Sequence, residues 1–149
     1  MTEIEIPEGP EPQAPQTRQE RIDYGRSVLD AINAEAGQRV MSGLGDVSPV
    51  LAEQAQIGFG EIYARPQLSP RDRQLLTLGM LTALGGCEAQ LEVHVNTALN
   101  VGLSADEIVE ALLHASAYCG FPRALNATFA AKRVFAERGL LPVGADGKQ

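Results

Sequence analysis

The sequence has little of several residue types that mark specialised protein classes. It contains two cysteines, Cys87 and Cys119, no tryptophan, and 5% aromatic residues in a chain of 149. Two cysteines are too few for the disulfide framework of a small secreted domain, so we expect reduced thiols and a cytoplasmic protein. No apolar run reaches the roughly 18 residues of a membrane span, and an acidic N-terminus is unlike a signal peptide. We therefore expect neither membrane insertion nor export.

Positive charge is also scarce. Twelve Lys and Arg residues face nineteen Asp and Glu residues, which gives a formal net charge of −7. A protein that binds nucleic acid needs a basic face for the phosphate backbone, so this balance argues against such a partner. Hydrophobic residues at 44% and charged residues at 21% are typical of a soluble globular domain. We expect a small molecule or another protein as the partner.

The pattern along the chain predicts one all-α domain between two tails. Proline and glutamate dominate residues 1–16, which we expect to form a disordered or arm-like tail. Residues 17–140 carry apolar residues at helical spacing, and 141–149 form a polar C-terminal tail. No stretch alternates with period two for long enough to build a sheet, so the predicted fold is all-helical.

Start and stop signals divide this domain into about six helices arranged as helix-turn-helix units. Ser-Pro pairs at 48–49 and 69–70 resemble an N-cap followed by a first helical residue, and Ser104 with Glu107 forms a capping box. Glycines interrupt the pattern between helices. The helix at 69–84 is apolar nearly all round, which places it in the centre of the fold or in a subunit interface. The expected helices are 17–40, 48–65, 69–84, 87–101, 104–120 and a last one from Pro122 to about 138.

His94 is the first candidate for chemistry. It follows Leu91 by three residues, so its imidazole projects from or beside the buried stripe of its helix. The alternative is a core histidine with one backbone hydrogen bond. Cys87 lies two turns earlier on the same face, roughly 10 Å away by helical rise. At a helix N-terminus its thiol pKa would be lowered by the helix dipole, although simple packing is the alternative.

Other polar residues have both a functional and a structural interpretation. Glu61 and Arg65 are four residues apart and pair across one turn, either in a site or on the surface. Arg73, early in its helix, is placed to reach a carboxylate or to remain solvated. Tyr118 offers a phenol donor to a pocket, and His114 is an interface or surface residue. No metal-binding spacing and no phosphate-binding glycine loop occurs, so we predict no metal or cofactor.

Four motifs occur in order along the chain, namely E-x-H, A-L-N-x-G, S-x-x-E-I-x-E and Y-x-G-F-P. They lie in the stretches FGEIYARPQLSPRDRQLLTLGMLTALGG, QLEVHVNTALNVGLSADEIVEALLHASAYCGFPRALNA and RVFAERG. Together these stretches resemble the carboxymuconolactone decarboxylase family, which shares its helical fold with the alkyl hydroperoxidase AhpD group. The resemblance covers roughly Arg21 to Gly139.

One departure separates the two branches of this superfamily. The AhpD-type branch carries a C-x-x-C dithiol with a histidine four residues after its second cysteine. Here Cys87 takes the first position, but Gln90 stands in the second. Cys119 replaces the missing thiol only if the fold brings it near Cys87. The decarboxylase branch is therefore favoured, with two alternatives: an AhpD-like thiol peroxidase or disulfide reductase using Cys87, and a non-catalytic helical oligomer that binds a small acid.

For the decarboxylase branch the resemblance implies loss of CO2 from a carboxylated unsaturated γ-lactone, giving an enol-lactone on the route from protocatechuate to 3-oxoadipate. No cofactor is implied, because the lactone carbonyl accepts the electrons. His94 would transfer a proton or stabilise the enolate, Arg73 would hold a carboxylate, and Glu61 would orient His94 or Arg65. The family forms rings of subunits, so a homo-oligomer, a trimer or hexamer, is implied. The substrate-binding residues implied are Arg65, Cys87 and Tyr118.

Overall fold

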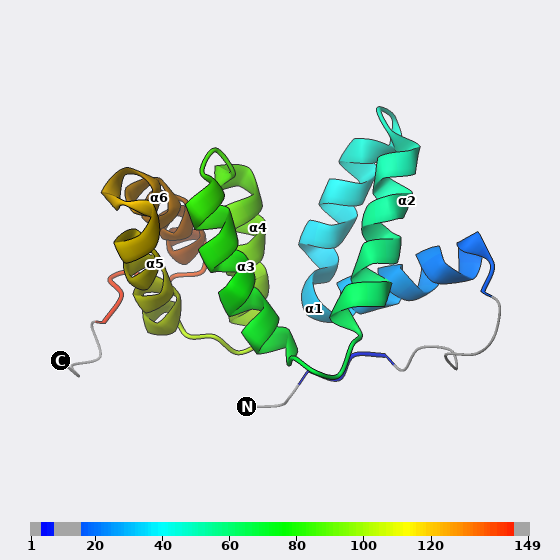
Figure 1. The fold of residues 1–149 in the computed structure, drawn as a ribbon, viewed down its shortest axis with the longest axis horizontal. Helices are drawn as coiled ribbons and strands as arrows, with labels where there is room; N and C mark the ends of the chain where they lie inside the picture. The colour runs from blue at the N-terminus through cyan, green and yellow to red at the C-terminus, as the bar shows by residue number, and fades with distance from the viewer. Residues whose placement is uncertain (1–3, 8–15, 145–149) are drawn as a thin grey trace. The chain divides into compact units, whose positions relative to one another are not determined.

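The computed structural model describes residues 4–7 and 16–144, and every regular element within them is helical (Figure 1). This confirms the predicted all-α class with about six helices. The described part of the chain divides at Pro70 and Arg71 into two compact units. Most of the expected N-terminal tail and the end of the expected C-terminal tail lie outside the described residues. The elements are α1 (Arg18–Gly45), α2 (Pro49–Gly58), the π-helical turn η1 (Phe59–Tyr63), α3 (Pro70–Leu84), α4 (Glu88–Asn100), α5 (Ala105–Cys119) and α6 (Phe121–Glu137).

Helix α1 begins as expected but ends later. Thr17 is its N-cap, and the Thr17 hydroxyl and the Glu20 carboxylate form a reciprocal capping box. The predicted end at Val40 is wrong, because the helix continues through Gly43 to Gly45. A helical glycine costs about 1 kcal/mol relative to alanine, which weakens a helix without ending it.

Helix α1 is interrupted at Asn33, a position that no sequence pattern marked. Its φ of −165° and ψ of 74° are not helical, so α1 consists of two helical segments joined by a kink. The Asn33 side-chain oxygen accepts a hydrogen bond from the backbone N–H of Ala36 at 3.2 Å. Asn33 therefore caps the second segment in the way that an N-cap residue does.

In the first unit α1 packs closely on α2. A Cβ built on Gly25 would lie 1.7 Å from the backbone oxygen of Gln56, so the two helices approach as only a glycine permits. An ion pair of Arg18 with Glu53, at 2.7 Å, joins the same two helices. Helix α2 starts at Pro49 as expected, although the hydroxyl of Ser48 makes no capping hydrogen bond.

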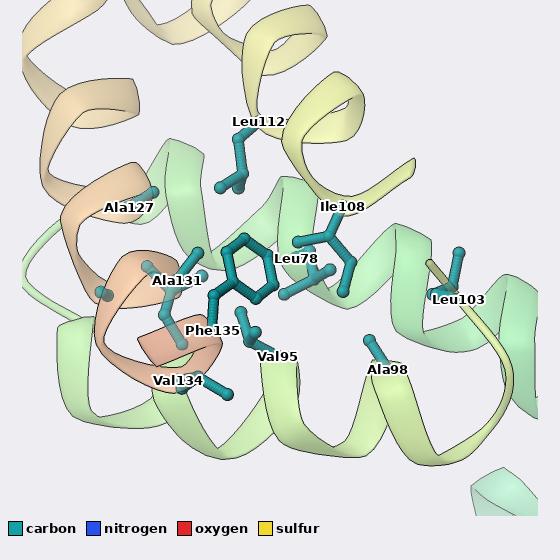
Figure 2. Packing of buried hydrophobic residues seen from close by; sticks show 12 residues of the cluster. Leu78, Val95, Ala98, Leu103, Ile108, Leu112, Ala127, Ala131, Val134 and Phe135 are labelled. Atoms are coloured by element: carbon teal, nitrogen blue, oxygen red, sulfur yellow. The ribbon is translucent and has the colours of Figure 1, made fainter. Parts of the chain in front are cut away.

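The second unit has its own hydrophobic core, to which all four of its helices contribute (Figure 2). Leu78 from α3, Val95 from α4, Ile108 and Leu112 from α5, and Phe135 from α6 point toward one another, each at most 2% exposed. Burying such side chains is worth about 1.5–3 kcal/mol each, so this core fixes the positions of α3 and α4.

Helix α3 has two different faces, although its sequence is apolar nearly all round. Leu78 is fully buried, whereas Leu76, Met80 and Leu84 are 55%, 50% and 67% exposed. One side of the helix thus belongs to the core of its unit, and the other is solvent-accessible in the single chain. Within the described residues no helix is both long and apolar enough to cross a membrane.

Candidate active site

His94 is held by a buried glutamine. The Nδ1 atom of His94, on α4, lies 2.9 Å from the side-chain oxygen of Gln74, on α3. Gln74 is 0% exposed, and His94 is partly buried. Burial lowers the pKa of the His94 imidazole below its ordinary value of 6.5, because a cation loses hydration there. The imidazole is therefore neutral at neutral pH.

The partner of His94 also decides which ring nitrogen carries the hydrogen. An amide oxygen only accepts hydrogen bonds, so Nδ1 of His94 is the donor in this arrangement. The lone pair is then on Nε2, which is the atom left to bind or release a proton. The amide nitrogen of Gln74 is buried and meets no hydrogen-bond acceptor among the described residues.

The two thiols lie at the ends of different helices. Cys87 is the N-cap residue of α4, as predicted, and its Sγ donates to the backbone oxygen of Gly85 at 3.5 Å. Cys119 ends α5, and its Sγ lies 3.8 Å from the backbone oxygen of Gly120. Both cysteines are free and half-buried. Each thiol thus contacts the backbone carbonyl of a residue close to it in the chain.

Arg73 directly precedes Gln74 on α3 and is half-buried, so its backbone is fixed beside the residue that holds His94. Tyr118 is 81% exposed, and its ring centroid is 5.2 Å from that of His114. Both of these α5 residues line a groove between α3 and α5 with a volume of about 590 Å³. We call it the α3/α5 groove, and His94 is not among the residues that line it.

The remaining predicted residues belong to the first unit. The Glu61 carboxylate, in η1, accepts two hydrogen bonds from the Arg21 guanidinium of α1, one of them 2.8 Å from Nε. Arg65 is exposed and follows the end of η1. The predicted pairing of Glu61 with Arg65 assumed the spacing of an α-helix. The π-helical turn adds a residue to the helical repeat, which changes that spacing.

Two contacts in the second unit were not anticipated. Glu107 completes the predicted capping box with Ser104, and its other oxygen accepts from Arg71, which joins the start of α5 to the start of α3. The hydrogen bond from the Ser104 backbone and, to a smaller extent, the contact with Arg71 hold the pKa of Glu107 below its usual value.

Gln74 is the other residue that the sequence analysis missed, because an amide in an apolar helix gives no sequence signal of its hydrogen-bond partner. The described residues contain no cluster of three acidic, histidine or cysteine side chains that fits a metal ion.

Known protein families can be compared with the segment that contains Gln74 and His94. The family model for carboxymuconolactone decarboxylases matches residues 49–133, which include Gln74, Cys87 and His94. The chain belongs to the carboxymuconolactone decarboxylase family. This membership confirms the resemblance deduced from the motifs.

Three relatives of this family member have been compared with it. The 4-carboxymuconolactone decarboxylase of Acinetobacter baylyi is 36% identical over 88 residues, which cover 59% of this chain and 65% of the relative. The nitrosuccinic acid decarboxylase of Metarhizium robertsii is 42% identical over 71 residues, 46% of this chain and 48% of that enzyme. An uncharacterised 15.0 kDa protein of Paracoccus denitrificans is 30% identical over 121 residues, 80% and 90% of the two chains. The match thus spans less than two thirds of each of the two named decarboxylases.

Proposed function

We propose that this chain is a carboxy-lyase that removes CO2 from a carboxylated unsaturated γ-lactone of the 4-carboxymuconolactone type, without a cofactor. The observation that carries the proposal is the hydrogen-bonded pair of the partly buried His94 and the buried Gln74 inside the segment that matches the family. Two relatives that match part of the chain are named decarboxylases, which supports loss of CO2 as the reaction class. The product would be an enol-lactone on the route from protocatechuate to 3-oxoadipate.

The reaction requires the protein to stabilise negative charge and to supply one proton. When the bond between the ring and the carboxylate breaks, its electron pair moves through the ring double bond into the lactone carbonyl, and CO2 leaves. The carbanion equivalent is an enolate, which then takes up one proton at carbon. Because the substrate supplies its own electron sink, the protein needs to hold the carboxylates, to stabilise the enolate oxygen and to deliver the proton.

We assign the proton delivery to Nε2 of His94. An anionic substrate favours the cationic imidazolium, so binding raises the proton affinity of a ring that is neutral in the free protein. Loss of CO2 moves the negative charge of one carboxylate onto the enolate, and transfer of the proton from the imidazolium to carbon then neutralises this charge. The transfer returns the ring to the neutral form that its partial burial favours. The Nδ1–H of His94 donates to Gln74 before and after this transfer, so the ring keeps its orientation.

Arg73 and Cys87 complete the proposal with supporting roles. The Arg73 guanidinium would bind a substrate carboxylate, since a planar cation next to Gln74 is suited to bidentate contact. Cys87 lies at the start of α4, two turns before His94, and would line the pocket that holds the substrate. Glu61, Arg65 and Tyr118 remain candidates for orienting groups or substrate contacts.

The test is CO2 release from 4-carboxymuconolactone by the purified full chain. His94→Gln should lower kcat by about 10²–10⁴-fold, because it removes the proton donor while keeping a polar side chain. Gln74→Leu should cause a smaller loss, with a changed pH profile, because the ring loses its fixed tautomer. Gln54→Leu is the matched control, since Gln54 is an exposed glutamine on α2.

Circular dichroism on each variant separates loss of chemistry from loss of fold. A His94→Gln protein with wild-type helicity and wild-type turnover would refute the role of His94. A wild-type chain that binds the lactone and releases no CO2 would refute the decarboxylase proposal and favour the non-catalytic acid-binding alternative.

A further inference from the structure

The side chain of Arg123, near the start of α6, lies against the turn that joins α3 to α4. A Cβ built on Gly85 in this turn would lie 3.3 Å from Nε, 3.5 Å from Cγ and 3.6 Å from Cδ of Arg123. Figure 1 shows the α3–α4 turn and the start of α6 at the same end of the second unit. Gly85 has a φ of +70°, in the left-handed region that favours glycine, and its lack of a side chain also leaves the space that Arg123 occupies.

The guanidinium of Arg123 is available to a ligand. Arg71 and Arg133 of the same unit each pair with a glutamate, and Arg138 donates to two asparagine side chains. Among the described residues Arg123, by contrast, has no hydrogen-bond or ion-pair partner, and it is exposed. It can therefore bind a carboxylate with two parallel hydrogen bonds without first breaking a bond inside the protein.

The position of Arg123 in its helix also points to an anion. Arg123 lies in the first turn of α6, which contains no acidic residue. The N-terminal end of a helix dipole is positive, so it favours negative charge there and disfavours a cation. The charge of Arg123 thus gains nothing from its own helix, whereas a bound carboxylate would be favoured by both the guanidinium and the dipole.

The turn at Gly85 leads directly to the candidate active site. The Cys87 thiol contacts the backbone oxygen of Gly85 at 3.5 Å, so Arg123 and Cys87 adjoin the same residue from two different helices. His94 follows Cys87 by seven residues on α4, on the same face and roughly 10 Å farther along the helix. A cation thus lies near the start of α4, and the proton donor assigned above lies two turns away.

A lactone of the 4-carboxymuconolactone type carries its reacting groups with a similar separation. One carboxylate is bonded to the ring and is lost as CO2, whereas the other ends a carboxymethyl arm on the same ring carbon and is retained. The carbon that takes up the proton is next to the lactone carbonyl, on the far side of the ring from this arm. With a hydrogen bond of roughly 3 Å at each end, such a substrate is long enough to join His94 to the turn beside Arg123.

We propose that Arg123 binds the carboxylate that the substrate retains, and thereby makes the site select a dicarboxylate over a monocarboxylate. This inference rests on the proposed decarboxylation and adds a second cation to it, since Arg73 is assigned to one substrate carboxylate only. The retained carboxylate has the same charge before and after CO2 leaves, so Arg123 stabilises the bound substrate and the transition state equally. Such uniform binding lowers KM and leaves kcat unchanged.

The test compares two lactones on purified full-chain variants. One is 4-carboxymuconolactone, and the other is its analogue with a methyl group in place of the carboxymethyl arm. Arg123→Gln removes the charge and keeps a polar side chain. It should raise KM for the dicarboxylate by about 10- to 100-fold with kcat within about 2-fold. KM for the methyl analogue should change by less than about 3-fold. Arg123→Lys keeps the charge without the planar fork and should recover part of the affinity.

The matched control is Arg133→Gln on the same helix, because Arg133 makes only an exposed ion pair with Glu92. It should leave KM for both lactones unchanged. If Arg123 only fixes α6 to the α3–α4 turn, Arg123→Gln should lower the melting temperature and keep the wild-type preference between the lactones, and that result overturns the proposal. An unchanged KM for the dicarboxylate in Arg123→Gln overturns it as well, whether or not the wild-type chain releases CO2 from that lactone.

Calorimetric binding distinguishes failure of this proposal from failure of the decarboxylase proposal. If the wild-type chain binds 4-carboxymuconolactone and releases no CO2, the decarboxylase proposal fails. A Kd about 10- to 100-fold higher in Arg123→Gln would then still support the contact of Arg123 with the arm carboxylate. A wild-type chain that binds neither lactone overturns both proposals.

Discussion

The contact of α1 with α2 at Gly25 gives a prediction whose sign can be worked out from the structure. In Gly25→Ala the new Cβ would lie 1.7 Å from the backbone oxygen of Gln56 and 2.4 Å from its carbonyl carbon. Ordinary contact begins at 3.4 Å, and a carbonyl in a helix cannot rotate away. The helices must separate by about 1.7 Å, which loosens a close-packed interface.

The free-energy cost of this separation should exceed the gain in helix propensity from alanine. Forcing extra atoms into a packed core costs about 1–3 kcal/mol, and here the clash is with backbone, which puts the cost at the upper end. Alanine returns about 1 kcal/mol of helix propensity. We expect Gly25→Ala to destabilise the chain by about 2 kcal/mol. In the matched control Gly43→Ala, the new Cβ meets nothing within 4 Å, so the propensity gain alone should stabilise the chain.

Urea unfolding followed by far-UV circular dichroism measures both variants. The Gly25→Ala midpoint should fall by about 1 M, and the Gly43→Ala midpoint should rise by a fraction of that. If Gly25→Ala unfolds at the wild-type midpoint, or if both substitutions destabilise equally, the close approach of α1 and α2 at Gly25 is wrong.

Three further predictions concern His94 and helix capping. Gln74→Glu brings a carboxylate to Nδ1 of His94 and should raise the proton-binding constant of that ring by about 10- to 1000-fold. Nitrogen NMR should follow this change, with exposed His114 unmoved, and a wild-type ring protonated on Nε2 would contradict the amide orientation. Because burial lowers the pKa of His94, its contribution to stability is present above pH 6.5 and is lost as the pH falls below that value; His94→Gln should flatten this part of the stability curve. Ser104→Ala should cost about 1 kcal/mol in thermal melts, whereas Ser48→Ala, which removes no capping bond, should cost nothing, and equal losses would contradict the capping assignment.

The sequence predicted those parts of the fold that depend on hydrogen bonds between residues close together in the chain. The capping box at Ser104 and Glu107 was predictable because both hydrogen bonds join residues three apart. The end of α1 was missed because Gly43 weakens a helix by an amount that tertiary packing overrides. Asn33 was missed for the opposite reason, since an asparagine at helical spacing carries no mark of a kink.

The candidate site was predictable in part. Helical spacing placed His94 beside a buried stripe, and the structure puts it there. Its partner Gln74 is twenty residues away on another helix, and nothing in the spacing of either helix says that their side chains meet. Glu61 likewise pairs with Arg21, forty residues earlier, which no pattern in one helix can reveal.

The neutral partner of His94 helps to distinguish the reactions that this superfamily supports. Dithiol chemistry needs two thiols and a base that draws protons from them. In this chain Gln90 occupies the second thiol position, and Cys87 and Cys119 each contact a local carbonyl. A carboxylate beside His94 would hold the ring as a cation before any substrate arrived. The amide of Gln74 instead leaves the ring neutral and oriented, so its charge responds to the charge of the ligand. An anionic substrate that loses one negative charge during the reaction would use this response directly, whereas a neutral peroxide would not.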